Sequence, residues 1–216
     1  MTRVPCRLAV LISGAGSTMV NLQEHIARGE VPARIAVVVS SRGDAPGIAR
    51  ARALGLEAQV LGREPFRRDG VLDEAAYSVA VAELLSEYSP DLVVLAGFMT
   101  RLEAAVLDRW PVMNVHPALL PAFGGEGFYG HRVHEAVLAS GANTTGATVH
   151  FVDGQYDHGP IVAREEIGVL PGESPEALAA RVQEVERRIY PCTVAAFARG
   201  ELADRCPVKS RSRGGA

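Results

Sequence analysis

Apolar runs without polar alternation recur along this chain, and they restrict its fold more than any other feature. Residues 8–12 and 92–96 are continuous apolar runs, and each is ended by a glycine-containing segment. A strand that is apolar on both faces must be covered on both faces, which is typical of a parallel sheet between helices. Segments with helical periodicity separate such runs. The sequence therefore predicts a single α/β domain with a mainly parallel twisted sheet flanked by helices.

The same periodicities place the individual elements. Strands are expected at residues 8–12, 35–39, 58–61, 92–96, around Asn114, 147–152 and 161–165. Helices are expected at residues 19–27, 48–54, 74–88, 133–139 and 174–199, the last beginning with a serine cap and a proline in its first turn. The polar and charged segment 62–71 is expected to be a surface loop near the functional site.

Composition sets the broad class of the protein. The chain has 216 residues, 48% of them hydrophobic, which is enough for one domain with a substantial core. The formal charge of -3 gives no basic field, so nucleic acid is not expected as a partner. The basic end of the chain, with Lys209, Arg211 and Arg213, favours a division into a domain at residues 1–203 and a flexible tail at 204–216.

Cysteine usage and hydropathy bear on location. Cys6, Cys192 and Cys206 are odd in number and widely spaced, which favours reduced thiols in a cytoplasmic protein over a disulfide framework. No run reaches about 18 apolar residues, so neither a membrane span nor a targeting segment is expected.

Asn114-Val115-His116-Pro117 carries the strongest chemical signal. Side chains two positions apart on a strand share a face, so the amide and the imidazole should lie together. An amide can donate to a developing oxyanion, and an imidazole can transfer a proton near neutral pH. Pro117 stops the strand and puts the pair at its carboxyl end, where open α/β sheets keep their sites. The pair is suited to acyl transfer, and ordinary polar residues at a strand end are the alternative.

A glycine-rich turn follows the first predicted strand. Ser13-Gly14-Ala15-Gly16-Ser17-Thr18 opens a helix, where free N–H groups and close backbone approach suit an anion. The third glycine of a dinucleotide fingerprint is missing, and the second strand ends in Ser40-Ser41, not in an acid. A monophosphate fits this turn better than a dinucleotide, although a turn that merely needs glycine is an equal alternative.

Residues 150–160 contain the third candidate group. A carboxylate near an imidazole favours its protonated form, and Asp157 or Asp153 could act in this way on His116. His150 is interpreted as a packed strand residue. Asp157 and His158 lack a third ligand at a convincing spacing, so no metal is expected.

Together, these ordered motifs resemble the phosphoribosylglycinamide formyltransferase family over nearly the whole chain. The matching segments are residues 12–17, 95–99, 114–117, 146–152 and 157–161. The resemblance implies a Rossmann-like formyltransferase fold and formyl transfer from 10-formyltetrahydrofolate to the amine of glycinamide ribonucleotide (GAR) in purine biosynthesis. It further implies small-molecule partners only and no metal. A monomer or a homodimer is compatible with it.

The resemblance also implies a role for individual residues. Asn114 would polarise the formyl oxygen, His116 would donate a proton and stabilise the oxyanion, and Asp157 would raise the pKa of the imidazole. The ribonucleotide would be bound by Gly16, Ser17, Thr18 and Glu186. The folate would be bound by Met99, Thr100, Arg101 and Leu102, largely through backbone groups, and by Asn114.

The chain departs from the family pattern at several positions. Thr18 replaces an asparagine, and Thr100-Arg101 replaces an arginine-isoleucine pair. The segment 124–130 is unusually rich in glycine, and is expected to be a mobile loop that closes over the folate. Arg67 and Arg68 are the candidates for a basic residue near the folate.

Three other functions share part of this pattern. A formyltetrahydrofolate deformylase would pass the formyl group to water and carries an extra amino-terminal domain, whereas here the glycine turn follows Met1 closely. A methionyl-tRNA formyltransferase would need a carboxyl-terminal RNA-binding domain. A silent nucleotide-binding module would keep the phosphate turn but not the chemistry of Asn114, His116 and Asp157. The sequence favours the GAR transferase.

Overall fold

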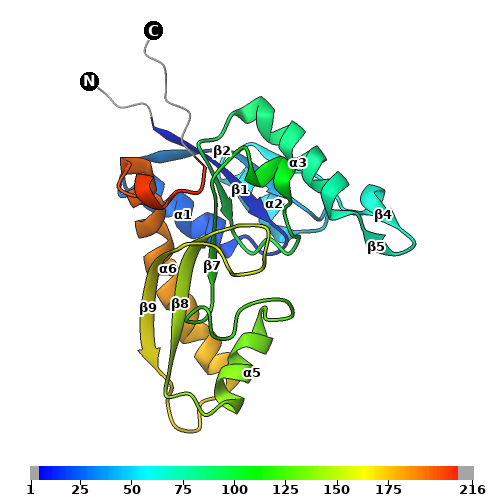
Figure 1. Cartoon of the computed structure of the whole chain (residues 1–216). Helices are drawn as coiled ribbons and strands as arrows, with labels where there is room; N and C mark the ends of the chain where they lie inside the picture. The colour runs from blue at the N-terminus through cyan, green and yellow to red at the C-terminus, as the bar shows by residue number, and fades with distance from the viewer. Residues whose placement is uncertain (1–4, 209–216) are drawn as a thin grey trace.

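The computed structural model describes residues 5–208, which form a seven-stranded sheet between helices (Figure 1). The sheet order is β3-β2-β1-β6-β7-β8-β9. These strands are β1 (Cys6–Ile12), β2 (Ala33–Ser40), β3 (Ala58–Val60), β6 (Leu92–Leu95), β7 (Val112–His116), β8 (Thr144–Phe151) and β9 (Ile161–Gly168). The pairings from β3 through β7 are parallel, while β8 and β9 are antiparallel. The predicted mainly parallel α/β sheet is confirmed.

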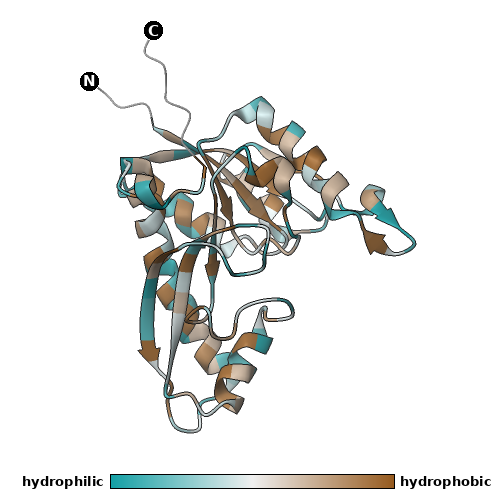
Figure 2. Ribbon diagram, viewed as in Figure 1, coloured by the Kyte–Doolittle hydropathy of each residue, from teal (hydrophilic) through white to brown (hydrophobic). Residues whose placement is uncertain are grey.

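Helices cover both faces of this sheet. They are α1 (Ser17–Ala27), α2 (Pro46–Ala53), α3 (Glu74–Tyr88), α4 (Ala104–Leu107), α5 (His131–Ala139) and α6 (Pro175–Arg199). In β1, Leu8 and Val10 face the cluster that includes α1, α2 and α6, and Ala9 and Leu11 face the cluster built with α3 and α4. The apolar colouring of the central strands in Figure 2 follows from this burial on both faces. A continuous apolar run is therefore what a central strand of this sheet requires.

The helices begin and end close to the predicted residues. Helix α3 spans the predicted residues 74–88, and its cap Asp73 accepts a hydrogen bond from the Ala76 N–H at 2.9 Å. Ser174 caps α6 by accepting from the Ala177 N–H at 3.2 Å. Strands β8 and β9 extend three residues beyond the predicted start and end, respectively, and the short helix α4 was not predicted.

The segment at residues 62–71 is more ordered than a loop. It contains a short 3₁₀ turn, η1 (Glu64–Phe66), and a two-stranded hairpin of β4 (Arg67–Arg68) and β5 (Val71–Leu72). Figure 1 shows the hairpin projecting beyond α3, away from β7 and β8. The predicted surface position is therefore confirmed, while the prediction of a loop was wrong. The two strands of the hairpin have two residues each, which is too short to reveal a period.

The chain's carboxyl-terminal part returns to the core after α6. A 3₁₀ turn, η2 (Ala203–Arg205), follows, and Arg205 Nη1 donates to the Val162 carbonyl at 3.0 Å. Cys206 packs against the core. Lys209, Arg211 and Arg213 of the predicted tail lie outside the described residues. Within residues 5–208, no helix combines the length and apolarity that crossing a membrane requires.

Gly146 in β8 is the position where the sheet tolerates a side chain least. A Cβ atom there would lie 1.9 Å from the Glu165 carbonyl oxygen of β9. Gly146→Ala is therefore expected to lower the free energy of unfolding by about 1–3 kcal/mol, as overpacking does. Urea denaturation checks this, with Gly62→Ala as the control, because a Cβ at Gly62 meets nothing within 4 Å. Equal stabilities of the two variants would contradict the packing argument.

Candidate active site

Asn114 and His116 lie at the carboxyl end of β7, as predicted. In the antiparallel ladder to β8, Asn114 is paired with His150 and His116 with Thr148. Asn114 is half-buried, and His116 is 4% exposed. The neighbouring parallel strands β1 and β6 end beside them, since the Ser13 N–H donates to the Gly97 carbonyl at 3.2 Å. The amide and the imidazole thus share the edge of the sheet that carries the glycine turn.

Both nitrogens of the His116 ring are occupied. Nε2 lies 2.8 Å from the Phe123 carbonyl oxygen, which can only accept, so Nε2 carries a hydrogen and donates. Nδ1 lies 3.3 Å from Asp157 Oδ2. Burial lowers the pKa of His116 below its ordinary value, and the charge of Asp157 and the Phe123 hydrogen bond oppose this only partly. Asp157 raises the pKa of the imidazole, as expected, but burial has the larger effect, so the net pKa is lowered.

Asp157 connects the two imidazoles of the site. Its Oδ2 accepts from the Gly125 N–H at 3.1 Å, and its Oδ1 lies 3.5 Å from His150 Nε2. Burial raises the pKa of this carboxyl, but the hydrogen bond with His150, the charge of His116 and the Gly125 N–H together bring it below its usual value. Asp157 is therefore a carboxylate at neutral pH. Its backbone φ of 52° lies in the left-handed region, which is uncommon for aspartate.

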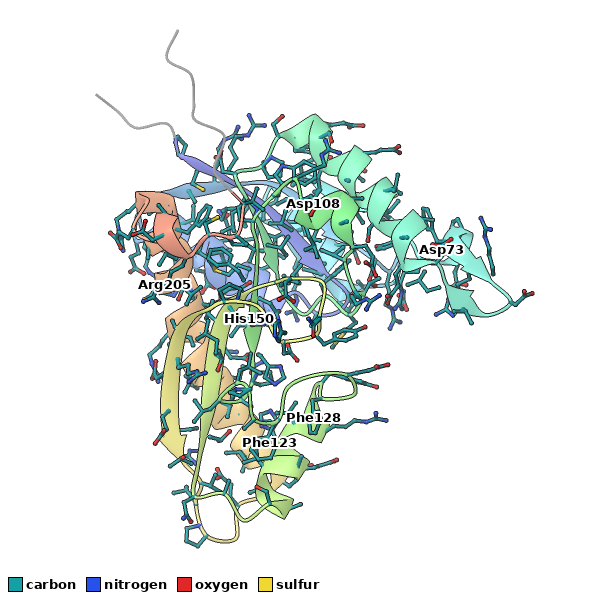
Figure 3. The ribbon with its side chains drawn as sticks, in the orientation of Figure 1. Asp73, Asp108, Phe123, Phe128, His150 and Arg205 are labelled. Carbon is teal, nitrogen blue, oxygen red and sulfur yellow. The ribbon has the colours of Figure 1, made fainter. Side chains whose placement is uncertain are left out.

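His150 is the member of this cluster that the sequence did not reveal. It is a buried strand residue, 1% exposed, as interpreted, but its ring also faces the site (Figure 3). Nδ1 lies 2.9 Å from the Phe151 carbonyl oxygen and therefore donates to it. Nε2 lies 3.2 Å from Asn114 Nδ2 and 3.5 Å from Asp157 Oδ1, so the ring contacts both the amide and the carboxylate. The contact follows from the pairing of Asn114 with His150 between β7 and β8. Strand register of this kind cannot be derived from a single sequence.

Asp153 does not contact His116. Its Oδ2 lies 2.7 Å from His158 Nδ1, and its Oδ1 accepts from the Gln155 N–H at 2.8 Å. These bonds close the base of the 153–159 loop, so the alternative role considered for Asp153 is wrong. Among the described residues, no group of three or more His, Cys, Asp or Glu side chains is arranged to bind a metal ion.

The glycine turn forms the amino terminus of α1. Gly16 occupies the cap position with φ 71°, and no side chain caps the helix. A Cβ at Gly16 would lie 2.9 Å from the Gly47 Cα of α2, so both the backbone conformation and the close approach require glycine. Ser17 and Thr18 follow in the first turn, where helical N–H groups lack carbonyl partners within the helix. The arrangement suits an anion.

Residues 99–102 follow β6 at the same edge. The Met99 N–H donates to Ser13 Oγ at 2.9 Å, which fixes this segment to the glycine turn. Thr100 and Leu102 are buried, and Met99 is 57% exposed. Arg101 forms ion pairs with Glu74 and Glu103. Contacts from this segment to a ligand therefore depend on its backbone and on Met99.

A family model described as formyl transferase matches residues 6–194. The match takes in the glycine turn, β7, β8 and most of α6. The chain belongs to the formyl transferase family.

Individual relatives of this chain are also named as formyltransferases. The phosphoribosylglycinamide formyltransferase of Mycobacterium tuberculosis is 41% identical over 202 residues, covering 90% of this chain and 86% of the relative. The chloroplastic phosphoribosylglycinamide formyltransferase of Arabidopsis thaliana is 38% identical over 189 residues, or 85% of this chain. The chain spans 62% of that plant protein, and 19% of the trifunctional purine biosynthetic protein adenosine-3 of Bos taurus.

Solved structures support the fold directly. The crystal structure of glycinamide ribonucleotide transformylase 1 from Symbiobacterium toebii superposes with a TM-score of 0.82 at 37% identity. The superposition covers 91% of this formyl transferase and 89% of that chain. The predicted formyltransferase fold is thereby confirmed.

Glu186 lies on α6, one turn before Tyr190. The Tyr190 hydroxyl lies 3.0 and 2.7 Å from the carbonyl oxygens of Leu95 and Met113, which ties α6 to the end of β6 and the start of β7. Asn21 of α1 donates to the Arg187 carbonyl at 3.0 Å, so Glu186 lies close to the helix that begins at the glycine turn. Burial raises the pKa of Glu186 to about 7.

The raised pKa of Glu186 should make the free energy of unfolding depend on pH. Between the ordinary carboxyl pKa and about 7, the folded chain keeps a proton on Glu186 that the unfolded chain loses. The free energy of unfolding therefore falls as pH rises through this window. Glu186→Gln should remove the fall, and gain about 1–3 kcal/mol relative to the wild type between pH 5 and pH 8. Urea denaturation of both proteins at the two pH values measures this gain. If the variant and the wild type differed in stability by the same amount at both pH values, the burial of the Glu186 carboxyl would be contradicted.

Proposed function

We propose that the chain transfers the formyl group of 10-formyltetrahydrofolate to the amine of GAR, giving formyl-GAR and tetrahydrofolate in purine biosynthesis. The observation that carries this proposal is the convergence of Asn114, His116 and Asp157 at a sheet edge beside a helix terminus suited to phosphate. Relatives named phosphoribosylglycinamide formyltransferase support the choice of substrates. The folate serves as co-substrate, and the proposed chemistry requires no metal.

The reaction requires one net proton movement. The neutral amine attacks the formyl carbon, and the formyl oxygen becomes an oxyanion that accepts hydrogen bonds from the Asn114 amide and the His116 ring. The new C–N bond forms, the bond to the folate nitrogen N10 breaks, and the proton lost by the amine ends on N10. Once the Phe123 carbonyl has left, a neutral His116 with its hydrogen on Nδ1, donated to Asp157, would take the amine proton on Nε2, donate that Nε2–H to the oxyanion and then pass the proton to N10.

For this role, His116 must exchange one of its contacts. The His116 Nε2–H is donated to the Phe123 carbonyl, so it is not available to an oxyanion. We infer that the formyl oxygen replaces this carbonyl when substrates bind, which requires the segment 121–130 to shift. Three glycines of this segment, Gly125, Gly127 and Gly130, have positive φ and no neighbour within 4 Å of a Cβ, which is compatible with such movement.

The remaining predicted residues would bind the two substrates. Gly16, Ser17 and Thr18 would hold the ribonucleotide phosphate, and Glu186 would accept hydrogen bonds from its sugar. The backbone at residues 99–102 would contact the folate pterin. Arg67 and Arg68 lie on the projecting hairpin, and this geometry gives neither a role at the formyl group.

We also propose a cytoplasmic location and a monomer or homodimer. The three cysteines all lie within the described residues and form no disulfide, which is compatible with a reducing compartment. Small-molecule substrates account for the site without nucleic acid as a partner.

Absorbance of 10-formyldideazafolate, a folate analogue, tests the proposed reaction. We expect loss of the formyl group only when GAR is present. Loss at the same rate without GAR would replace the proposal with a deformylase. GAR binding without any loss would indicate a silent nucleotide-binding module.

A further inference from the structure

Arg101 is held by side chains from three separate segments. Its Nε donates to Glu74 Oε2 of α3 at 2.8 Å, and its Nη2 to Glu103. Its guanidinium carbon lies 5.9 Å from the centre of the Tyr156 ring, within the range of a cation–π contact. The guanidinium thus joins α3 and the 99–102 segment to the 153–159 loop.

Tyr156 directly precedes Asp157 in that loop. The base of the loop is fixed by the pair of Asp153 and His158 and by Gly159, where a Cβ would lie 2.0 Å from the Phe151 carbonyl oxygen. Tyr156 is 47% exposed, and its ring contacts Arg101. Asp157 itself contacts the Gly125 N–H, His116 and His150, and the contact of Tyr156 with Arg101 fixes the loop one residue before it.

We propose that Arg101 is a positioning residue that holds Tyr156, and through it Asp157, at the His116 ring. This inference rests on the proposed formyl transfer only for its kinetic consequences. The residue acts through the loop and not on the substrate.

Two physical features make this contact matter. Asp157 adopts a left-handed backbone conformation that costs free energy for a residue with a side chain, so surrounding contacts must maintain it. Arg101 is also the cation among the carboxylates Glu74, Glu103 and Glu126. Burial and these carboxylates raise the pKa of the Tyr156 phenol, and Arg101 lowers it. Without the guanidinium, these carboxylates would repel one another where the loop docks.

Lysine would not replace this arginine. A planar guanidinium can bond to two carboxylates and stack on a ring at the same time, whereas an ammonium is a compact charge that satisfies fewer of these contacts. The positioning role of Arg101 therefore requires the shape of the guanidinium and not only its charge.

The test compares Arg101→Met, Arg101→Lys and Tyr156→Ala with the wild type. Arg109→Met is the matched control, because Arg109 also lies over an aromatic ring, 4.5 Å from the Trp110 centroid, but precedes β7 at the opposite end from His116. We expect kcat to fall about 10- to 100-fold in each of the three variants, since small displacements of reacting groups have effects of this size. KM for the folate should change less than kcat, and Arg109→Met should retain the wild-type kcat.

The ring signals of His116 in ligand-free protein give a readout that does not depend on turnover. The charged groups that act on this ring are Asp157 and His150, with His134 of α5 nearby. The charge of Asp157 raises the pKa of His116, so its displacement should lower that pKa further in Arg101→Met and Tyr156→Ala. NMR titration measures this, with the His116 signal identified by its absence in His116→Ala.

Non-additivity completes the test. If both residues act through one contact, the double variant Arg101→Met/Tyr156→Ala should be no worse than the poorer single variant. A raised folate KM with unchanged kcat, an unshifted His116 pKa or additive losses would each overturn the inference. Failure of the proposed function would look different, because the wild type itself would then show no GAR-dependent turnover while the pKa shift persisted.

Discussion

His116→Ala is expected to lower kcat for formyl transfer by about 10²- to 10⁴-fold, the range of a lost general acid–base group. The imidazole is the one titratable ring that contacts Asp157 and has a donor, Nε2–H, directed at a position that a substrate oxygen can take over. In the proposed mechanism, its removal abolishes both the proton transfer and one oxyanion hydrogen bond. The KM values should change much less, because the proposed phosphate and pterin contacts lie on other segments.

Initial rates with saturating GAR and 10-formyldideazafolate measure this effect. His25→Ala is the matched control, since His25 lies on α1 and pairs with Glu30 at the surface. The control should keep wild-type rates. A His116→Ala variant within a factor of three of the wild type would remove the ring from the chemistry, since general acid–base groups contribute about 10²-fold at least.

Asn114→Ala is expected to lower kcat by about 10²- to 10³-fold, the cost of losing one oxyanion donor. The Asn114 amide is held by His150, at 3.2 Å from Nε2, so one N–H is already oriented and the other is directed by the same geometry. Alanine removes the donor and leaves His150 without that partner. The transition state should therefore suffer more than substrate binding.

Asn143→Ala is the control for the amide, because Asn143 lies in the exposed turn before β8. Rates are compared at equal folded fractions, verified by circular dichroism. If Asn114→Ala raised only KM and left kcat unchanged, the amide would bind the folate without stabilising the oxyanion.

The fold could be predicted from the sequence because its signals are local. The apolar runs of β1 and β6 have no polar face, so they had to be central strands, and the capped start of α6 was written in Ser174 and Pro175. The hairpin of β4 and β5 was missed because two-residue strands are too short to show a period.

The site could be predicted in part. Asn114 and His116 share a face by spacing alone, and the glycine turn follows its strand in the context that a phosphate site needs. The contact of His150 with Asn114 depends on the register of β7 and β8, and that of Arg101 with Tyr156 joins residues far apart in the sequence. Neither distance follows from local patterns.

The protonation of His116 shows a different limit. Asp157 was expected to raise the imidazole pKa, and it does act in that direction. The ring is also enclosed so completely that desolvation has the larger effect. The residue types alone indicate Asp157 as a partner of His116, while the burial of the ring is known only from the packed structure.

A crystal structure of the chain with GAR and a non-transferable 10-formyl folate analogue would test the central claim most directly. The account predicts that the formyl oxygen lies within hydrogen-bond distance of Asn114 Nδ2 and His116 Nε2, that the Phe123 carbonyl has moved away, and that the amine faces the formyl carbon. A formyl group bound away from both side chains, with Phe123 still accepting from His116, would contradict the account.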